Sequence, residues 1–154
     1  MKKAILLVLC SIGIFQTVIS QSKCVDQQSA APAKIIVLVN TAIWCPACKA
    51  NGERVEKNVL VTYMSDPRFD IIINDISTEE TKIASNKAIA KAKISEIAAT
   101  TKSTGMIYFI DPLTQKILGE ISVTKTTEEI KRAFNDAPNL SGKQTNYKCD
   151  EHHK

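Results

Sequence analysis

Glycine, histidine and excess charge are all scarce in this chain of 154 residues. Five glycines leave little material for a glycine-rich phosphate-binding loop. The two histidines, His152 and His153, are adjacent at the end of the chain, and no Ser/His/Asp arrangement or paired-carboxylate site is apparent. The formal net charge is only +4 and the lysines are dispersed among acidic residues, which argues against a nucleic-acid partner. The sequence therefore excludes several common classes of catalytic and binding site.

The overall composition is that of a globular protein. Hydrophobic residues make up 44% of the chain and charged residues 23%. At this length, that balance predicts one domain with one core rather than a disordered or fibrous chain.

The first twenty residues have the pattern of a secretory signal peptide. Lys2 and Lys3 precede a short apolar run, and the small residue Ser20 is a suitable cleavage site. We therefore expect residues 1–20 to be removed and the mature protein to be periplasmic or secreted, without a stable membrane span. Loss of the two lysines lowers the net charge from +4 to +2.

Two alternatives to cleavage stay open. One is a lipoprotein anchor at Cys10 or Cys24, although Leu9 and Lys23 before these cysteines fit a lipobox poorly. The other is a retained apolar helix that anchors the domain.

Removal of residues 1–20 would take Cys10 with it and leave four cysteines in the mature protein. These four can form disulfides, because disulfides persist outside the cytoplasm. Cys24 lies in a polar tether, residues 21–33, and Cys149 lies in a polar tail, residues 138–154. We expect these two cysteines to form a structural disulfide between tether and tail. The alternative makes one of them a third redox cysteine that exchanges with the central pair.

The middle of the chain alternates strand and helix patterns. Residues 34–40 are an apolar, β-branched run typical of a central strand buried on both faces, and residues 69–76 predict a second strand. Residues 46–64 predict a helix that buries Val55, Val59 and Tyr63.

A second helix is predicted over residues 77–99. It would begin with a capping box from Ser77 to Glu80, in which the Ser77 hydroxyl accepts from the Glu80 N–H. Its apolar stripe would consist of four residues, Ile83, Ala90, Ile94 and Ile97.

The last part of the pattern predicts a hairpin and a helix. Residues 106–110 and 117–123 flank a turn-rich segment typical of an antiparallel pair. A capping box over residues 126–129 begins a short helix that ends at Pro138, with three residues facing inward: Ile130, Ala133 and Phe134. The order βαβαββα predicts an α/β domain over residues 34–137, with a mixed sheet of about four strands flanked by about three helices.

Residues 44–49, Trp-Cys-Pro-Ala-Cys-Lys, carry the chemistry, because they place a Cys-x-x-Cys pair where a strand passes into a helix. A thiol at the start of a helix is close to unpaired N–H groups and to the positive end of the dipole, which favour the thiolate. We therefore expect Cys45 to attack and Cys48, more buried and less acidic, to resolve. Pro46 suits the first helical turn, and Trp44 is expected to shield one side of the sulfur pair.

This segment, with the later hairpin, resembles the thioredoxin superfamily and in particular its exported bacterial members. The resemblance covers residues 34–137, but only the Trp-Cys-x-x-Cys-Lys motif is specific in sequence. It implies a thioredoxin-like fold with Cys45 as nucleophile, Cys48 as resolving thiol and Pro46 and Ala47 between them.

The chain departs from that family at three places. Val39 stands where thioredoxins commonly bury an acidic residue that handles the proton of the second cysteine. No kinking proline lies between Cys48 and Asp66, which predicts a straighter helix. Thr104 matches the position of the family's cis-proline, and a cis bond before it would cost about 2.5–4 kcal/mol, against about 0.5–1 before proline. A trans loop and a tightly held cis peptide both stay open.

These features predict an exported thiol–disulfide oxidoreductase without a cofactor, acting on protein or small-thiol disulfides and regenerated by a redox partner. Pro46 and Ala47 include no histidine of the kind that stabilises the thiolate in strongly oxidising relatives, which favours a reductase or isomerase. Two other hypotheses remain: a module in which both thiolates hold a soft metal such as Cu(I), and a non-catalytic domain. A weaker metal site would use Cys149, His152 and His153.

Overall fold

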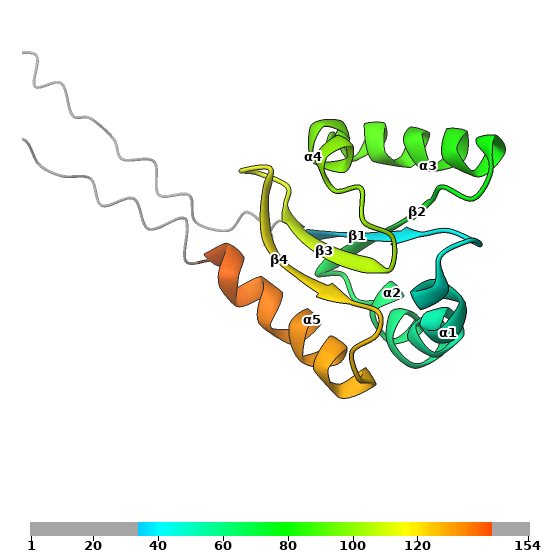
Figure 1. The fold of residues 1–154 in the computed structure, drawn as a ribbon. Coiled ribbons are helices and arrows are strands. Elements are labelled where there is room, and N and C mark those ends of the chain that lie inside the picture. The colour runs from blue at the N-terminus through cyan, green and yellow to red at the C-terminus, as the bar shows by residue number, and fades with distance from the viewer. Residues whose placement is uncertain (1–33, 143–154) are drawn as a thin grey trace, which may run out of the picture.

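A computed structural model describes residues 34–142 and shows one four-stranded sheet between two layers of helices (Figure 1). Its elements in chain order are β1 (Ile35–Thr41), α1 (Pro46–Val55), η1 (Glu56–Leu60), α2 (Val61–Met64), β2 (Phe69–Asp75), α3 (Glu79–Lys91), α4 (Ser95–Thr100), β3 (Met106–Asp111), β4 (Lys116–Ser122) and α5 (Thr127–Gly142).

The sheet has the strand order β2-β1-β3-β4 and is mixed. β1 pairs in parallel with β2 and antiparallel with β3, and β3 pairs antiparallel with β4. This confirms the predicted α/β class, the mixed four-stranded sheet and the hairpin. β1 lies inside the sheet and is buried over six of its seven residues, as its continuous apolar sequence predicts.

Two apolar cores lie on the two faces of the sheet. α3 and α4 cover one face, where seven buried residues pack: Ile36, Leu38, Ile72, Ile89, Ile94, Tyr108 and Ile110. α1, α2 and α5 cover the other face (Figure 1). There Phe134 is fully buried and contacts three more rings. The centroids of Phe134 and Tyr63 lie 4.2 Å apart with the rings stacked, and Phe69 and Phe109 meet Phe134 edge-on. We call these four rings the aromatic core.

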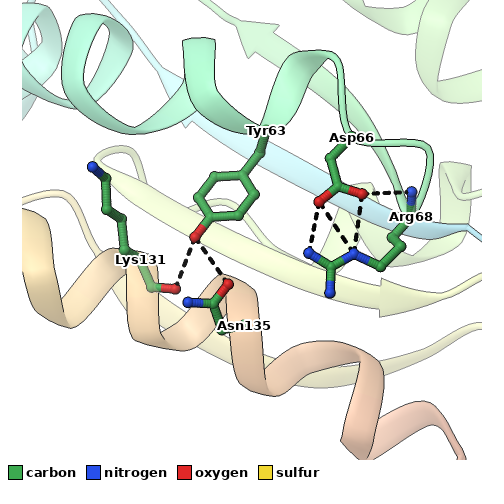
Figure 2. A network of polar contacts seen from close by, with 5 residues as sticks. All are labelled: Tyr63, Asp66, Arg68, Lys131 and Asn135. Carbon is green, nitrogen blue, oxygen red and sulfur yellow. Dashed lines mark hydrogen bonds and ion pairs between the residues drawn. The ribbon is translucent and has the colours of Figure 1, made fainter.

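The hydroxyl of Tyr63 connects the end of α2 to α5 (Figure 2). It lies 3.1 Å from both the Lys131 carbonyl oxygen and Asn135 Oδ1, so that its proton has an acceptor although the ring is buried. Burial raises the pKa of Tyr63 above its ordinary value of 10.0. Beside it, hydrogen bonds from Arg68 lower the pKa of Asp66 and fix the turn that leads into β2.

The N-cap of the helix predicted over residues 77–99 lies one residue later than expected. Thr78 is the N-cap, and its hydroxyl accepts from Thr81 N–H at 3.2 Å. The prediction of a Ser77 cap is wrong because the Ser77 hydroxyl instead donates to the Asp75 carboxylate and accepts from the Ile43 N–H.

The same helix is also interrupted, and half of its predicted stripe is exposed. α3 ends at Lys91 and α4 begins at Ser95, with Lys93 at φ 60° between them. Ile83 is 56% exposed, so its place in the stripe is wrong, and Ala90 is exposed as well. The buried positions of α3 are Ser85 and Ile89. The Ser85 hydroxyl accepts from the Asp75 N–H and donates to the Asp75 carbonyl oxygen at the end of β2.

Two other helical predictions need correction. The helix over residues 46–64 buries Val55, Val59 and Tyr63 as predicted, but it is not regular, because η1 is π-helical. Pro138 does not end α5, which continues to Gly142. Buried Ala137 and a hydrogen bond from Ser141 Oγ to Asp111 Oδ2, 3.3 Å long, hold this last part against the sheet. Within residues 34–142, no helix is both long and apolar enough to cross a membrane.

Candidate redox site

Cys45 and Cys48 are joined in a disulfide at the carboxyl end of β1, with their Cα atoms 5.2 Å apart. Cys45 is the N-cap of α1 and Pro46 occupies its first turn, where a missing N–H costs no hydrogen bond. The Cys48 N–H points to Cys45 Sγ at 3.2 Å. Cys45 Sγ therefore lies at the first turn of α1, as predicted. The N–H groups of that turn and the positive end of the helix dipole favour negative charge on this sulfur.

The order of burial is the reverse of the one predicted. Cys45 is 3% exposed and Cys48 is 9% exposed, and both pack with Ala42, Ala47 and Ile76. Trp44 is 57% exposed, and its shielding of the sulfur pair stays a prediction.

Gly105 is the residue that lies against Cys45, one place after Thr104. A Cβ atom on Gly105 would lie 3.5 Å from Cys45 Sγ and 3.2 Å from Ala47 Cβ, and its φ of 74° is one that side chains rarely adopt. Residues 34–142 contain no cis peptide bond, so the peptide before Thr104 is trans. Of the two alternatives that the sequence left open, the trans loop is the one present, and it ends on Gly105.

Buried Asn40 holds this loop in place. Its side-chain amide donates to the carbonyl oxygens of Thr101 and Ser103, and its backbone carbonyl oxygen accepts from Gly105 N–H at 2.8 Å. Asn40 Oδ1 in turn accepts from Asn74 Nδ2 at 2.9 Å across the parallel β1–β2 pair, in which the two asparagines are in register. We call Asn40, Asn74 and residues 101–105 the loop clamp.

Two hollows reach Cys48 from different sides. The first, about 200 Å³, lies beneath α1 and is lined mainly by apolar side chains that include the register partners Val39 and Ile73. Asn40, Thr41 and Glu56 add its polar groups. The second, about 430 Å³ and more open, has four charged or hydroxyl-bearing residues on its wall: Thr41, Lys49, Asp75 and Ser77.

Comparison with known proteins gives no matching family and no matching curated protein, but it gives similar solved structures. No family model matches the chain, and no curated protein matches it. A Bacteroides thetaiotaomicron structure described as a candidate protein disulfide isomerase is similar, with 19% identity, a TM-score of 0.48 and coverage of 73% of this chain and 78% of that one. The structure of Trxlp from Edwardsiella tarda EIB202 is similar at 14% identity and a TM-score of 0.38, over 67% of this chain and 84% of that one. The interpretation of the site consequently depends on its own geometry.

The other predicted site residues lie outside residues 34–142: Cys24, Cys149, His152 and His153. Their disulfide, their redox relay and their metal site stay predictions. Within the part of the chain that the structure describes, no group of three or more His, Cys, Asp or Glu side chains could hold a metal ion.

Four residues at or beside the site were not predicted as site residues from the sequence: Asn40, Asn74, Gly105 and Glu56. The two asparagines had a signal, because each interrupts an apolar strand near its end and parallel pairing places the two ends together. Gly105 was visible as a glycine just before a strand, a position that often marks a close backbone approach. Glu56 had a signal as well, because it follows Cys48 by eight residues and Gly52 by four, a spacing that places the three on one helical face.

Proposed function

We propose that this protein is an exported thiol–disulfide oxidoreductase that acts as a reductase or isomerase and uses Cys45 as its nucleophile. The observation that carries the proposal is the disulfide itself, formed between the N-cap residue of α1 and a cysteine one turn later. A helix start that favours the Cys45 thiolate makes this sulfur both a reactive nucleophile and a good leaving group.

The reaction begins from the dithiol. The Cys45 thiolate attacks one sulfur of a substrate disulfide, a mixed disulfide forms, and the other substrate sulfur leaves as a thiolate that takes a proton. Cys48 then loses its proton and attacks Cys45 Sγ, which releases the second substrate thiolate and forms the Cys45–Cys48 bond seen here. Because Cys45 is almost fully buried in the disulfide state, its sulfur must turn toward solvent once the bond is reduced.

The substrates in this proposal are disulfides of proteins or small thiols in an exported compartment, and a separate redox partner returns the dithiol. No cofactor is required, because both electrons reside on the two cysteine sulfurs. Pro46 and Ala47 between the cysteines support a moderate potential rather than a strongly oxidising one.

Trapping tests this proposal. In the full-length protein, Cys48→Ala removes the resolving thiol, so that mixed disulfides on Cys45 accumulate and can be isolated and identified by mass spectrometry. The matched control is Cys45→Ala, which keeps one cysteine in the same site. The proposal expects reductant-sensitive adducts with Cys48→Ala and few with Cys45→Ala; equal trapping by both variants, or none by either, contradicts it.

A further inference from the structure

The resolving step needs a base. Cys48 must become a thiolate before it can attack Cys45 Sγ, and the cluster in which it packs, with Ala42, Ala47 and Ile76, contains no group that takes its proton. Val39 and Ile73, which face each other in the β1–β2 register beside Cys48, cannot take a proton. The proton must therefore leave by another route.

The hollow beneath α1 offers such a route. Of the residues that line it, only Cys48 and Glu56 are ionisable. A volume of about 200 Å³ holds several water molecules, and Asn40 and Thr41 add polar groups to its lining. Glu56 lies at the start of π-helical η1, a type of turn often found at functional sites.

The charged groups near Glu56 on its own helical stretch are already engaged. Lys57 Nζ pairs with Glu53 at 2.6 Å, and the Arg54 guanidinium donates to Thr127 Oγ1 and the Val123 carbonyl oxygen. Among residues 34–142, no ion pair or side-chain hydrogen bond involves the Glu56 carboxylate. Within the described part of the chain, Glu56 is thus an unpaired, solvent-exposed carboxylate that lines the same hollow as Cys48.

Asp75 is an alternative base, because it lies on the wall of the second hollow beside Cys48. Lys49 lines the same hollow. Asp75 Oδ1 accepts from both the N–H and the hydroxyl of Ser77. Two hydrogen bonds from Ser77 therefore already occupy Oδ1 of Asp75.

We propose that Glu56 accepts the proton of Cys48, through water in the hollow beneath α1, when Cys48 resolves the mixed disulfide. This inference rests on the proposed function. The Cys48 Sγ–H proton passes through water to the Glu56 carboxylate, and the sulfur's electron pair forms the bond to Cys45 Sγ. The substrate sulfur departs as a thiolate, and Glu56 later returns its proton to solvent.

The test isolates the second step in the full-length protein. Reduced protein is treated at acid pH with 2,2′-dipyridyl disulfide, which forms a pyridyl mixed disulfide on Cys45. A stopped-flow pH jump then starts the attack by Cys48, and released thiopyridone reports its rate by absorbance. Glu56→Gln is compared with Glu53→Gln, a charge-matched control on the same helical stretch that does not line the hollow.

Near neutral pH, the Glu56→Gln variant is expected to form the Cys45–Cys48 bond about 100-fold more slowly than wild type, at the lower end of the range for a lost general base. Its rate should keep rising with hydroxide and meet the wild-type rate at alkaline pH, where solvent removes the proton. Glu53→Gln should follow wild type throughout.

A rate and pH profile of Glu56→Gln equal to wild type overturns the inference while leaving the proposed function intact. So does a loss that appears in Asp75→Asn and not in Glu56→Gln. If the wild-type dithiol forms no mixed disulfide on Cys45, the proposed function fails and this inference fails with it.

Discussion

The aromatic core and the redox site lie on the same sheet but are held together by different forces. The core packs four rings around fully buried Phe134, and its order comes from apolar area removed from water. The site buries only Ala42, Cys45 and Cys48 as a small apolar cluster, and the backbone against it is fixed by the hydrogen bonds of the loop clamp. Substitutions in the aromatic core should therefore lower stability without changing the rate of disulfide exchange. Substitutions in the loop clamp should instead alter access to the sulfurs.

The largest expected effect is in the core. Phe134→Ala removes the ring that contacts Tyr63, Phe69 and Phe109, and should lower the free energy of unfolding by about 3–5 kcal/mol. Urea unfolding measures the loss. Below the unfolding transition, the rate of disulfide exchange per folded molecule should match wild type, and a large change in that rate would break the separation between core and site.

The second-largest effect is expected in the loop clamp. Asn40→Ala leaves Asn74 and two loop carbonyl groups without their partner, which should cost about 1–3 kcal/mol. The freed loop should also expose Cys45, so alkylation of the reduced protein at this residue should become faster. Asn74→Ala is the control, because it keeps the bonds from Asn40 to the loop; equal acceleration in both variants would show that the loop bonds are not what limits access.

A methyl group on the loop should have a smaller effect. Gly105→Ala combines an unfavourable φ of 74° with a contact of 3.2 Å to Ala47 Cβ, and should cost about 1–2 kcal/mol. Gly119→Ala is the matched control, since no atom lies within 4 Å of a Cβ built there. Comparable stability of the two variants in urea would show that Gly105 is not under steric constraint.

The smallest effect concerns Tyr63. At neutral pH, Tyr63→Phe should lose about 0.5–1.5 kcal/mol with the hydrogen bonds to α5. Because burial raises the pKa of Tyr63, the neutral hydroxyl stabilises the fold fully below about pH 10, and that contribution is lost as the pH rises above 10. Urea midpoints across this range should fall more for wild type than for Tyr63→Phe; parallel curves would contradict the assignment.

Strong periodic signals made the fold predictable from sequence. The apolar run of β1, the four-residue spacing of Val55, Val59 and Tyr63, and the capping box formed by Thr126 and Glu129 are all present in the structure. The Cys-x-x-Cys pair at a strand-to-helix junction was equally legible, because its chemistry depends on local spacing.

The remaining features were not local and could not be predicted in the same way. The helix predicted to begin at Ser77 starts later because Asp75 and Ile43, the latter distant in sequence, compete for that hydroxyl. The greater burial of Cys45 accompanies a close approach by Gly105, sixty residues away, which no pattern in residues 44–49 encodes. Tertiary contacts decided both cases.

Insulin reduction is the most direct test of the central claim, that Cys45 and Cys48 form a working dithiol. With a thiol reductant, the wild-type protein should turn over insulin disulfides, Cys45→Ser should abolish turnover, and Glu53→Gln should leave it unchanged. The claim would be contradicted by a wild-type protein that shows no turnover and, when purified under reducing conditions, carries stoichiometric soft metal on the two thiolates.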